Sequence, residues 1–169
     1  MRKSQIVGQE VFDSGDGVVA VDRVQLTVGP EPWAYAREHE AAIAVDWRER
    51  SASNPLYFNG VVHVLRAATF DGGTFAATLT RTDFASYLHW RLAGYPRTHA
   101  QSIIGAAAVI ARDGQLILAS QAQGHLNGGR LACIGGIIDE RDASPDGRID
   151  IDAQIRRELL EETGLAAGE

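Results

Sequence analysis

Residues Gly135 to Leu165 read GGIIDERDASPDGRIDIDAQIRRELLEETGL, and this stretch decides which fold we expect for the chain. The segment from Arg156 to Thr163 holds good helix formers and neither glycine nor proline, which predicts a helix. Asp150 and Asp152 are candidate N-caps of that helix. Gly164 suits the position just after its last residue, where a left-handed backbone is common.

Three glutamates of the predicted helix share one face, because Glu158, Glu161 and Glu162 stand at positions i, i+3 and i+4. Two of them fall in the last turn, where the helix dipole disfavours an anion by about 0.3–1 kcal/mol. A hard divalent cation such as Mg²⁺ or Mn²⁺ would remove this cost, since carboxylate oxygens are its preferred ligands. A solvated acidic helix end is the alternative, because a folded domain can carry penalties of this size.

A pair of glycines precedes the helix and extends the pattern. Gly135 and Gly136 follow a short apolar run, and paired glycines after a strand let the backbone approach a ligand closely. Together with the helix they resemble the signature of the Nudix hydrolase family, G-x5-E-x7-R-E-U-x-E-E-x-G-U, in which U is a bulky apolar residue. Residues 157–165 match the second part of that signature throughout. Asp142 stands where the signature has Glu, and fourteen residues instead of seven separate it from Arg157.

The resemblance implies hydrolysis, with Mg²⁺ or Mn²⁺ as cofactor, of a diphosphate linkage in a nucleoside diphosphate derivative; a UDP-sugar is one candidate substrate. Carried onto matching positions, it makes Glu158, Glu161 and Glu162 metal ligands and adds the backbone carbonyl of Gly136. One of Glu161 and Glu162 is then a candidate acceptor of the proton of water. Arg157 would orient a glutamate through a bidentate bond. The expected catalytic residues are therefore Arg157, Glu161 and Glu162.

Substrate contacts are expected at the glycine pair, Gly135 and Gly136. His125, in the glycine-rich loop of residues 121–130, is a further candidate, with a solvated loop histidine as the alternative. That loop has no Lys-Ser or Lys-Thr after its glycines, so it is not a P-loop.

The seven-residue insertion permits a second interpretation. Residues 142–153 resemble an EF-hand calcium loop, with oxygen-bearing side chains at loop positions 1, 3, 5 and 9 and glycine at position 6. However, position 12 is Ala153 where the loop needs a bidentate Glu, and Pro145 interrupts it. An acidic turn is therefore the default interpretation. The candidate calcium ligands are Asp142, Ser144, Asp146 and Asp150.

The whole sequence predicts two parts, an α+β N-terminal extension over residues 1–98 and a Nudix core over residues 99–169. Parts of the extension resemble a divergent Nudix branch that includes a UDP-glucose diphosphatase; they are Trp47-Arg48, residues 56–60 and residues 82–88. The expected elements of the extension are a strand at 24–28, a helix at 31–50, hairpin strands at 56–68 and 74–80, and a helix at 84–92 capped by Thr82 or Asp83. Those of the core are strands at 102–111 and 115–120 and the acidic helix.

The expected fold is therefore α/β, with a Nudix-type mixed sheet and an acidic helix behind the N-terminal extension. The resemblance implies further strands, and usually a final helix, after the acidic helix, and these are absent from the 169 residues. We therefore expect this segment to be inactive alone, and to need a continuation, a homo-oligomer or a second chain that completes the sheet.

Composition narrows the classes of function. The formal net charge of −6 argues against a general binder of nucleic acid or anionic membranes. Cys133 is the only cysteine, so no intramolecular disulfide can form, and its apolar neighbours predict a small buried residue. No apolar run approaches the ~20 residues of a membrane span, and a cytoplasmic location is the default expectation. Two other functions stay open: a Nudix-like module that binds nucleotide without turnover, and a calcium-stabilised structural domain.

Overall fold

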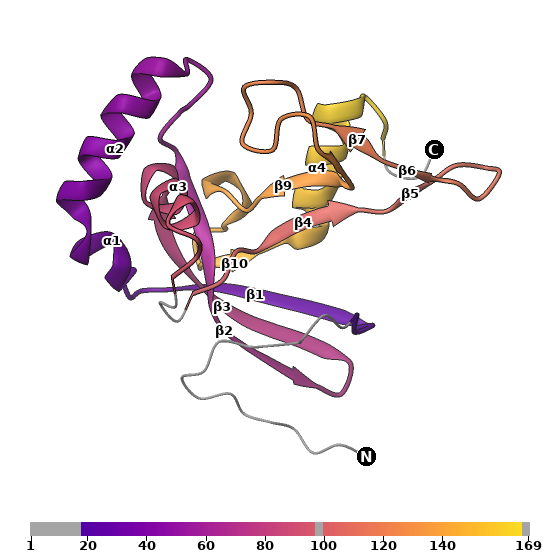
Figure 1. Ribbon diagram of the computed structural model, residues 1–169. Coiled ribbons are helices and arrows are strands. Elements are labelled where there is room, and N and C mark those ends of the chain that lie inside the picture. The colour runs from indigo at the N-terminus through magenta and orange to yellow at the C-terminus, as the bar shows by residue number, and fades with distance from the viewer. Residues whose placement is uncertain (1–17, 97–99, 167–169) are drawn as a thin grey trace.

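A four-stranded mixed sheet forms the centre of the computed structural model, which describes residues 18–96 and 100–166 (Figure 1). Strands β1 and β3 run parallel, whereas β2 and β10 each run antiparallel to their neighbours. The strand order is β10-β1-β3-β2. The predicted α/β class with a mixed sheet is therefore confirmed. The bounds are Arg23–Gly29 for β1, Val61–Asp71 for β2, Thr74–Asp83 for β3 and Arg148–Ile149 for β10.

The hairpin between β2 and β3 forms at the predicted turn. Gly72 and Gly73 have φ angles of 51° and 79°, the left-handed values that a two-residue hairpin turn requires. Strand β2 begins at Val61, later than the predicted start at residue 56. The chain first makes a turn in which the Asn54 side chain accepts a hydrogen bond from the backbone N–H of Leu56 at 3.1 Å.

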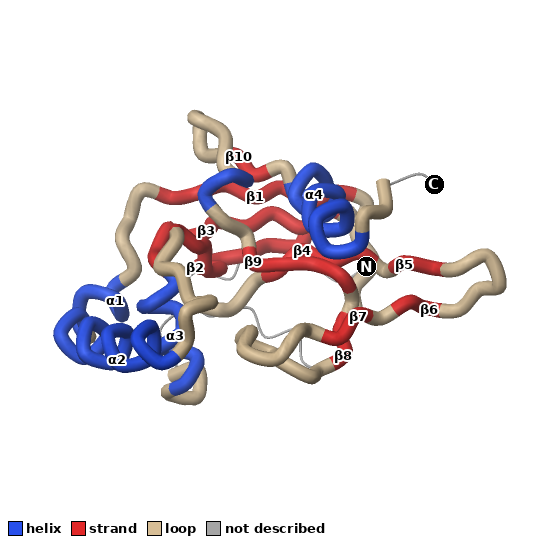
Figure 2. The backbone as a smooth tube through the Cα atoms, turned by 90° about the horizontal axis from the view of Figure 1, so that it is seen from above, coloured by secondary structure: helices blue, strands red, loops and turns tan. Residues whose placement is uncertain are grey.

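The predicted single helix over residues 31–50 is two helices, α1 (Ala34–Glu38) and α2 (Glu40–Ser53). The break lies at His39, whose φ of −113° and ψ of 12° are not helical, and whose ring Nδ1 lies 3.1 Å from the carbonyl oxygen of Tyr35. Helix α3 (Phe84–Leu92) forms as predicted. Its N-cap is Asp83, whose carboxylate accepts a hydrogen bond from the backbone N–H of Ser86 at 2.8 Å. Figure 2 shows these three helices gathered together at one end of the sheet, apart from α4.

The second half of the chain forms three short antiparallel pairs, β4 with β9, β5 with β6, and β7 with β8. The predicted strands over 102–111 and 115–120 are each divided in two, because the chain changes partner partway along both: β4 pairs with β9, but β5 pairs with β6. The bounds are Ile104–Ala107 (β4), Val109–Ile110 (β5), Leu116–Ile117 (β6), Ala119–Ser120 (β7), Leu131–Ala132 (β8) and Ile134–Ile137 (β9). Apolar side chains of these small sheets remain exposed, among them Ile104 and Leu131.

Helix α4 (Ile151–Thr163) is the predicted acidic helix, and both of its ends form as predicted. The Asp150 carboxylate accepts a hydrogen bond from the backbone N–H of Ala153 at 3.0 Å, and Gly164 closes the helix with φ of 74°. The helix packs closely on β4 and β9. A Cβ at Gly105 would collide with the Gln154 side chain, so this glycine permits the close approach.

The hydrophobic core has two clusters, and both combine the predicted extension with the predicted core segment. Alternation along β2 directs Val62 and Val64 to a cluster that holds Trp33, Tyr87 and Trp90. The other cluster combines residues of the extension with two from the second half of the chain; its buried members are Leu26, Leu65, Ala68, Ala77, Leu79, Ile138 and Ile149. Trp90 and Tyr87 belong to this core, since both side chains are buried. The division at residue 98 stays a prediction.

Among the residues that the structure describes, no helix has the length and apolar character that are needed to cross a membrane.

His63 predicts a pH dependence of stability. Its ring is 2% exposed and its Nδ1 lies 3.3 Å from the carbonyl oxygen of Ile138. Burial lowers the pKa of His63 and nearby Arg81 adds to this effect, whereas the Ile138 carbonyl, Asp142 and Asp139 oppose it. The unfolded chain therefore binds more protons than the folded chain once the pH falls to about 6.5 and below, so stability falls with pH in that range. We expect the melting temperature to drop less steeply between pH 7.5 and pH 5 in His63→Asn. An equally steep drop in the variant would contradict this.

Candidate functional site

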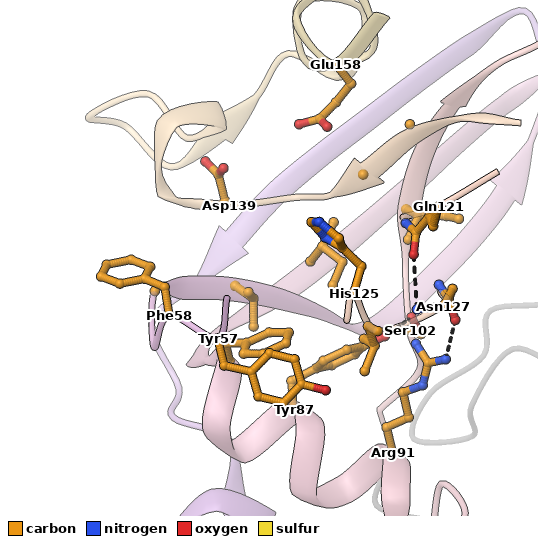
Figure 3. A pocket seen from close by; sticks show the side chains of 18 of the residues that line it. Tyr57, Phe58, Tyr87, Arg91, Ser102, Gln121, His125, Asn127, Asp139 and Glu158 are labelled. Atoms are coloured by element: carbon orange, nitrogen blue, oxygen red, sulfur yellow. Dashed lines mark hydrogen bonds between the residues drawn. The ribbon is translucent and has the colours of Figure 1, made fainter. Parts of the chain in front are cut away.

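A cavity of about 940 Å³ lies between the N-terminal helices and helix α4. Residues from both halves of the chain line it. Figure 3 shows its two ends: Glu158 and Asp139 at one, and the aromatic side chains of Tyr57, Phe58 and Tyr87 at the other. The two ends differ in chemistry.

The acidic end is formed where α4 crosses β9. The Glu158 carboxylate lies so close to Gly136 that a Cβ there would stand 2.5 Å from its Oε2, which only glycine avoids. Gln154, 1% exposed, donates a hydrogen bond from Nε2 to the Gly136 carbonyl at 3.3 Å. Burial raises the pKa of Glu158; Glu161 and Glu162 raise it further, while Arg157 opposes them. The predicted ligands Glu158 and Gly136 are thus brought together on facing elements.

Arg157 connects the carboxylates of this end. Its guanidinium lies 2.8 Å from Asp142, 2.9 Å from Glu158 and 3.1 Å from Glu161. The Asp142 side chain is only 3% exposed, so this ion pair is largely shielded from water. Asp142 therefore meets Arg157 in spite of the insertion between them. With Asp139 at 3.8 Å, Arg157 contacts four carboxylates rather than holding one glutamate through the expected bidentate bond.

The glutamates that were predicted to act together are not equivalent. Glu158 and Glu162 line the cavity, whereas Glu161 does not. Glu161 is held by two arginines, Arg157 at 3.1 Å and Arg141 at 3.3 Å. No ion pair involves Glu162 within the described part of the chain. Glu162 is therefore the member of the set that is freest to meet a ligand.

The insertion follows the 3-10 turn η1 (Glu140–Asp142) and contains strand β10. Its four candidate calcium ligands have separate partners. Asp142 binds Arg157, Asp150 caps α4, and Ser144 donates a hydrogen bond to Asp146 at 2.5 Å. Across residues 18–96 and 100–166, no three His, Cys, Asp or Glu side chains are grouped so as to hold a metal ion. Neither the calcium candidates nor the α4 glutamates therefore form such a group.

Two cavity residues, Asp139 and Arg141, were missed by the sequence analysis. Arg141 donates to Asp139 at 2.7 Å, and its side chain is 60% exposed. Desolvation acts to raise the pKa of Asp139, but hydrogen bonds from the Arg141 side chain and backbone leave that pKa below its ordinary value. Arg141 is thus a positive group on the cavity wall beside Glu158. The family signature leaves both positions unspecified, so it gave no signal for them.

The aromatic end combines apolar rings with polar side chains. The hydroxyl of Tyr87 lies 2.9 Å from that of Ser102, and Arg91 donates a hydrogen bond to Asn127 at 2.5 Å. Phe58 is 81% exposed, so its ring is available to a ligand. Such rings can stack on a planar group while the polar side chains hydrogen-bond to its edge.

The predicted substrate contacts also lie at this cavity. Gly135, Gly136 and His125 all line it, and Figure 3 shows His125 between Glu158 and the aromatic side chains. Strand pairing also requires a glycine at position 135, because a Cβ there would collide with the carbonyl of Gly105 on the paired strand. Cys133 was predicted to be buried, which is wrong: it is exposed and lines the cavity. It precedes the buried Ile134, and successive side chains of an extended chain point to opposite faces.

The ion pair between Asp142 and Arg157 predicts a stability effect. Asp142→Asn removes the charge of a buried partner, and we expect the free energy of unfolding to fall by about 1–3 kcal/mol. Urea unfolding would measure this. Asp146→Asn is the matched control, because Asp146 pairs with Arg148 on the surface and should matter little. Similar losses in both variants would show that the Asp142 pair has no special importance.

Comparison of the chain with protein-family models gives no match, and comparison with curated proteins also gives none.

Proposed function

We propose that this chain is a Nudix-type hydrolase that cleaves, with Mg²⁺ or Mn²⁺, the diphosphate linkage of a nucleoside diphosphate derivative. One observation carries the proposal: a single cavity joins the α4 carboxylates to an arginine and a set of aromatic rings. A nucleoside diphosphate has the matching parts, an anionic diphosphate that binds through cations and a planar base that stacks. The resemblance of residues 157–165 to the Nudix signature supports the same reaction class.

The donor set at the acidic end fits a hard cation in its chemistry. Glu158, Glu162 and the Gly136 carbonyl would hold it, because they are oxygen donors on facing elements that line the cavity. Glu161 would join them only by giving up its contacts with Arg157 and Arg141. When bound, the cation supplies charge neutralisation for the diphosphate and lowers the pKa of the attacking water.

Roles for the other groups follow from their positions. Glu162 has no ion-pair partner in the described residues, so we assign it the task of accepting the proton of water. The exposed guanidinium of Arg141 would bind a phosphate oxygen, for which its planar set of N–H donors is suited. Tyr57 and Phe58 would stack on the base or cover the linked group, while the buried Tyr87 supports this end from below. A UDP-sugar is one candidate for the whole substrate.

A nucleotide-binding module without turnover is the second candidate. The observation that favours it is the pairing of Glu158 and Glu161 with Arg157, which occupies two of the carboxylates that a catalytic cation would need. Cation binding without hydrolysis, in a sample whose sheet is completed by further strands, would select this function over the first.

The proposed Nudix-type sheet would need further strands. Among the described residues, β4 and β9 pair only with each other, and the side chains of Ile104 and Leu131 are 60% and 68% exposed. Strands from a continuation of the chain or from a second chain would cover such apolar surface. The expectation that this segment alone is inactive stays a prediction, and sizing together with a hydrolysis assay tests it.

The assignment of Glu158 and Glu162 as metal ligands predicts what removal of either carboxylate does to turnover. Glu158→Gln and Glu162→Gln each remove an anionic ligand, so we expect kcat to fall at least ~10²-fold with the fold kept. Binding of Mn²⁺, followed by electron paramagnetic resonance, should weaken in parallel and gives a readout even if turnover is absent. Asp152→Asn is the control, because Asp152 lies in the first turn of α4 and does not line the cavity.

Three results separate the alternatives. Loss of both Mn²⁺ binding and turnover in the two glutamine variants supports the hydrolase. Mn²⁺ binding that depends on the glutamates, without any hydrolysis even when a chain that completes the sheet is supplied, supports the binding module. Unchanged Mn²⁺ binding in both variants would overturn the metal-site assignment.

The exposed ring of Phe58 predicts an effect on substrate affinity. Stacking of a base on an aromatic side chain is worth about 1–3 kcal/mol, so Phe58→Ala should raise KM about fivefold or more and leave kcat nearly unchanged. Leu116→Ala removes an exposed apolar side chain outside the cavity and is the matched control. If KM stays the same in Phe58→Ala, the base or linked group does not stack at this end.

A further inference from the structure

A second groove, of about 830 Å³, lies among the N-terminal helices and does not belong to the site described above. Helices α1 and α2 form one wall, and the end of β3 with the start of α3 forms the other. It shares Asn59 and Val61 with the first cavity, and none of the carboxylates of α4 reach it. Its chemistry is cationic at the rim and apolar inside.

The first observation is an unsatisfied donor. Trp33 lines the groove, its side chain is only 5% exposed, and its indole Nε1 is buried without a hydrogen-bond partner among the described residues. The indole of Trp90, by contrast, donates to the carbonyl of Pro96 at 2.9 Å. A buried N–H without a partner is costly, and the few that occur in folded proteins need an explanation. An acceptor atom of a bound molecule would satisfy this donor once the indole turns its N–H, which is closed to solvent here, toward the groove.

The second observation is the charge at the rim. Arg37 and Arg48 line the groove, and no ion pair involves either of them in the part of the chain described. Arg81 also lines it but is paired with Glu140 at 3.1 Å. Of the two acidic residues at the groove, Asp83 already serves as the N-cap of α3, which leaves Glu40. Two free guanidinium groups in a chain of net charge −6 favour an anionic ligand.

The third observation is the apolar lining. Ala36, Ile43 and Trp47 are among the apolar residues that line the groove. A bare inorganic anion would leave this surface uncovered, whereas a ligand with a compact apolar body would bury it. The lining therefore selects an amphiphilic molecule over a simple ion.

We propose that the groove is a binding site for a small organic oxyanion, an aromatic carboxylate or phosphate ester. Its ring packs on Ile43 and Trp47, and its oxygens accept hydrogen bonds from Trp33 Nε1 and from Arg37 or Arg48. The site goes beyond the proposed hydrolase function and does not depend on it.

The test observes the Trp33 donor directly. In the ¹⁵N-labelled full chain, each tryptophan indole gives its own ¹H–¹⁵N signal, and triple-resonance experiments assign them. Titration with phenyl phosphate and, separately, with benzoate should move the Trp33 signal saturably and further than the signal of Trp90, which packs edge-on against Trp33 but already donates to Pro96. Phenol, which has the ring without the oxyanion, should not do so. Binding of only one of the two anions supports the proposal and identifies the oxyanion.

Variants at the rim separate this site from adventitious binding. Arg37 and Arg48 are exposed, so Arg37→Ala/Arg48→Ala should fold, and we expect its dissociation constant for the bound anion to rise about tenfold. Arg112→Ala, which removes an exposed arginine outside both cavities, should bind as the parent does. The proposal is overturned if the Trp33 signal does not move, if phenol moves it equally, or if Arg112→Ala weakens binding as much as the double variant.

Discussion

The ion pair between Arg157 and the buried carboxylate of Asp142 fixes the acidic end of the cavity. Asp142 ends the turn that follows β9, and Arg157 lies at the middle of α4, so their contact at 2.8 Å holds two elements in one position. Asp142 also accepts a hydrogen bond from the backbone N–H of Asp139 at 2.8 Å. The same turn therefore places Asp139 and Arg141 opposite Glu158. Loss of this ion pair would release α4 and the turn after β9 from each other. It would also disturb Glu158 and Glu161, because both contact the same guanidinium.

The insertion between Asp142 and Arg157 joins the two halves of the molecule. Strand β10 lies within it and pairs antiparallel with β1, so that Leu26 lies opposite Ile149. Ile149 then enters the cluster that Leu26 and Leu79 build on the main sheet. An insertion that resembles a calcium loop in sequence is thus an edge strand of the sheet, and its acidic side chains form local hydrogen bonds and ion pairs. This arrangement also explains how the N-terminal elements come to face α4 across one cavity.

Local sequence patterns predicted those features whose causes are local. The acidic helix, its cap at Asp150, the Gly72-Gly73 turn and the cap of α3 each depend on residues within a few positions of one another. The failures all involve partners that are distant in sequence or a conformation that propensity does not encode. His39 breaks a helix, the strand after residue 102 changes partner, and Cys133 faces a cavity built by remote segments. The sequence did not indicate Arg141, because its place on the cavity wall depends on segments that are distant in sequence.

Charge balance explains why the carboxylates of α4 tolerate one another. Three glutamates on the last two turns would repel each other and the helix dipole. Arg157 and Arg141 offset this for Glu161 and, in part, for Glu158, but Glu162 receives no such partner from the described residues. Burial meanwhile raises the pKa of Glu158, since a shielded anion beside two other carboxylates is unfavourable. The uncompensated negative charge is therefore concentrated on the two glutamates that line the cavity. A cation bound there would gain most from these two side chains while Arg157 keeps its hold on Asp142.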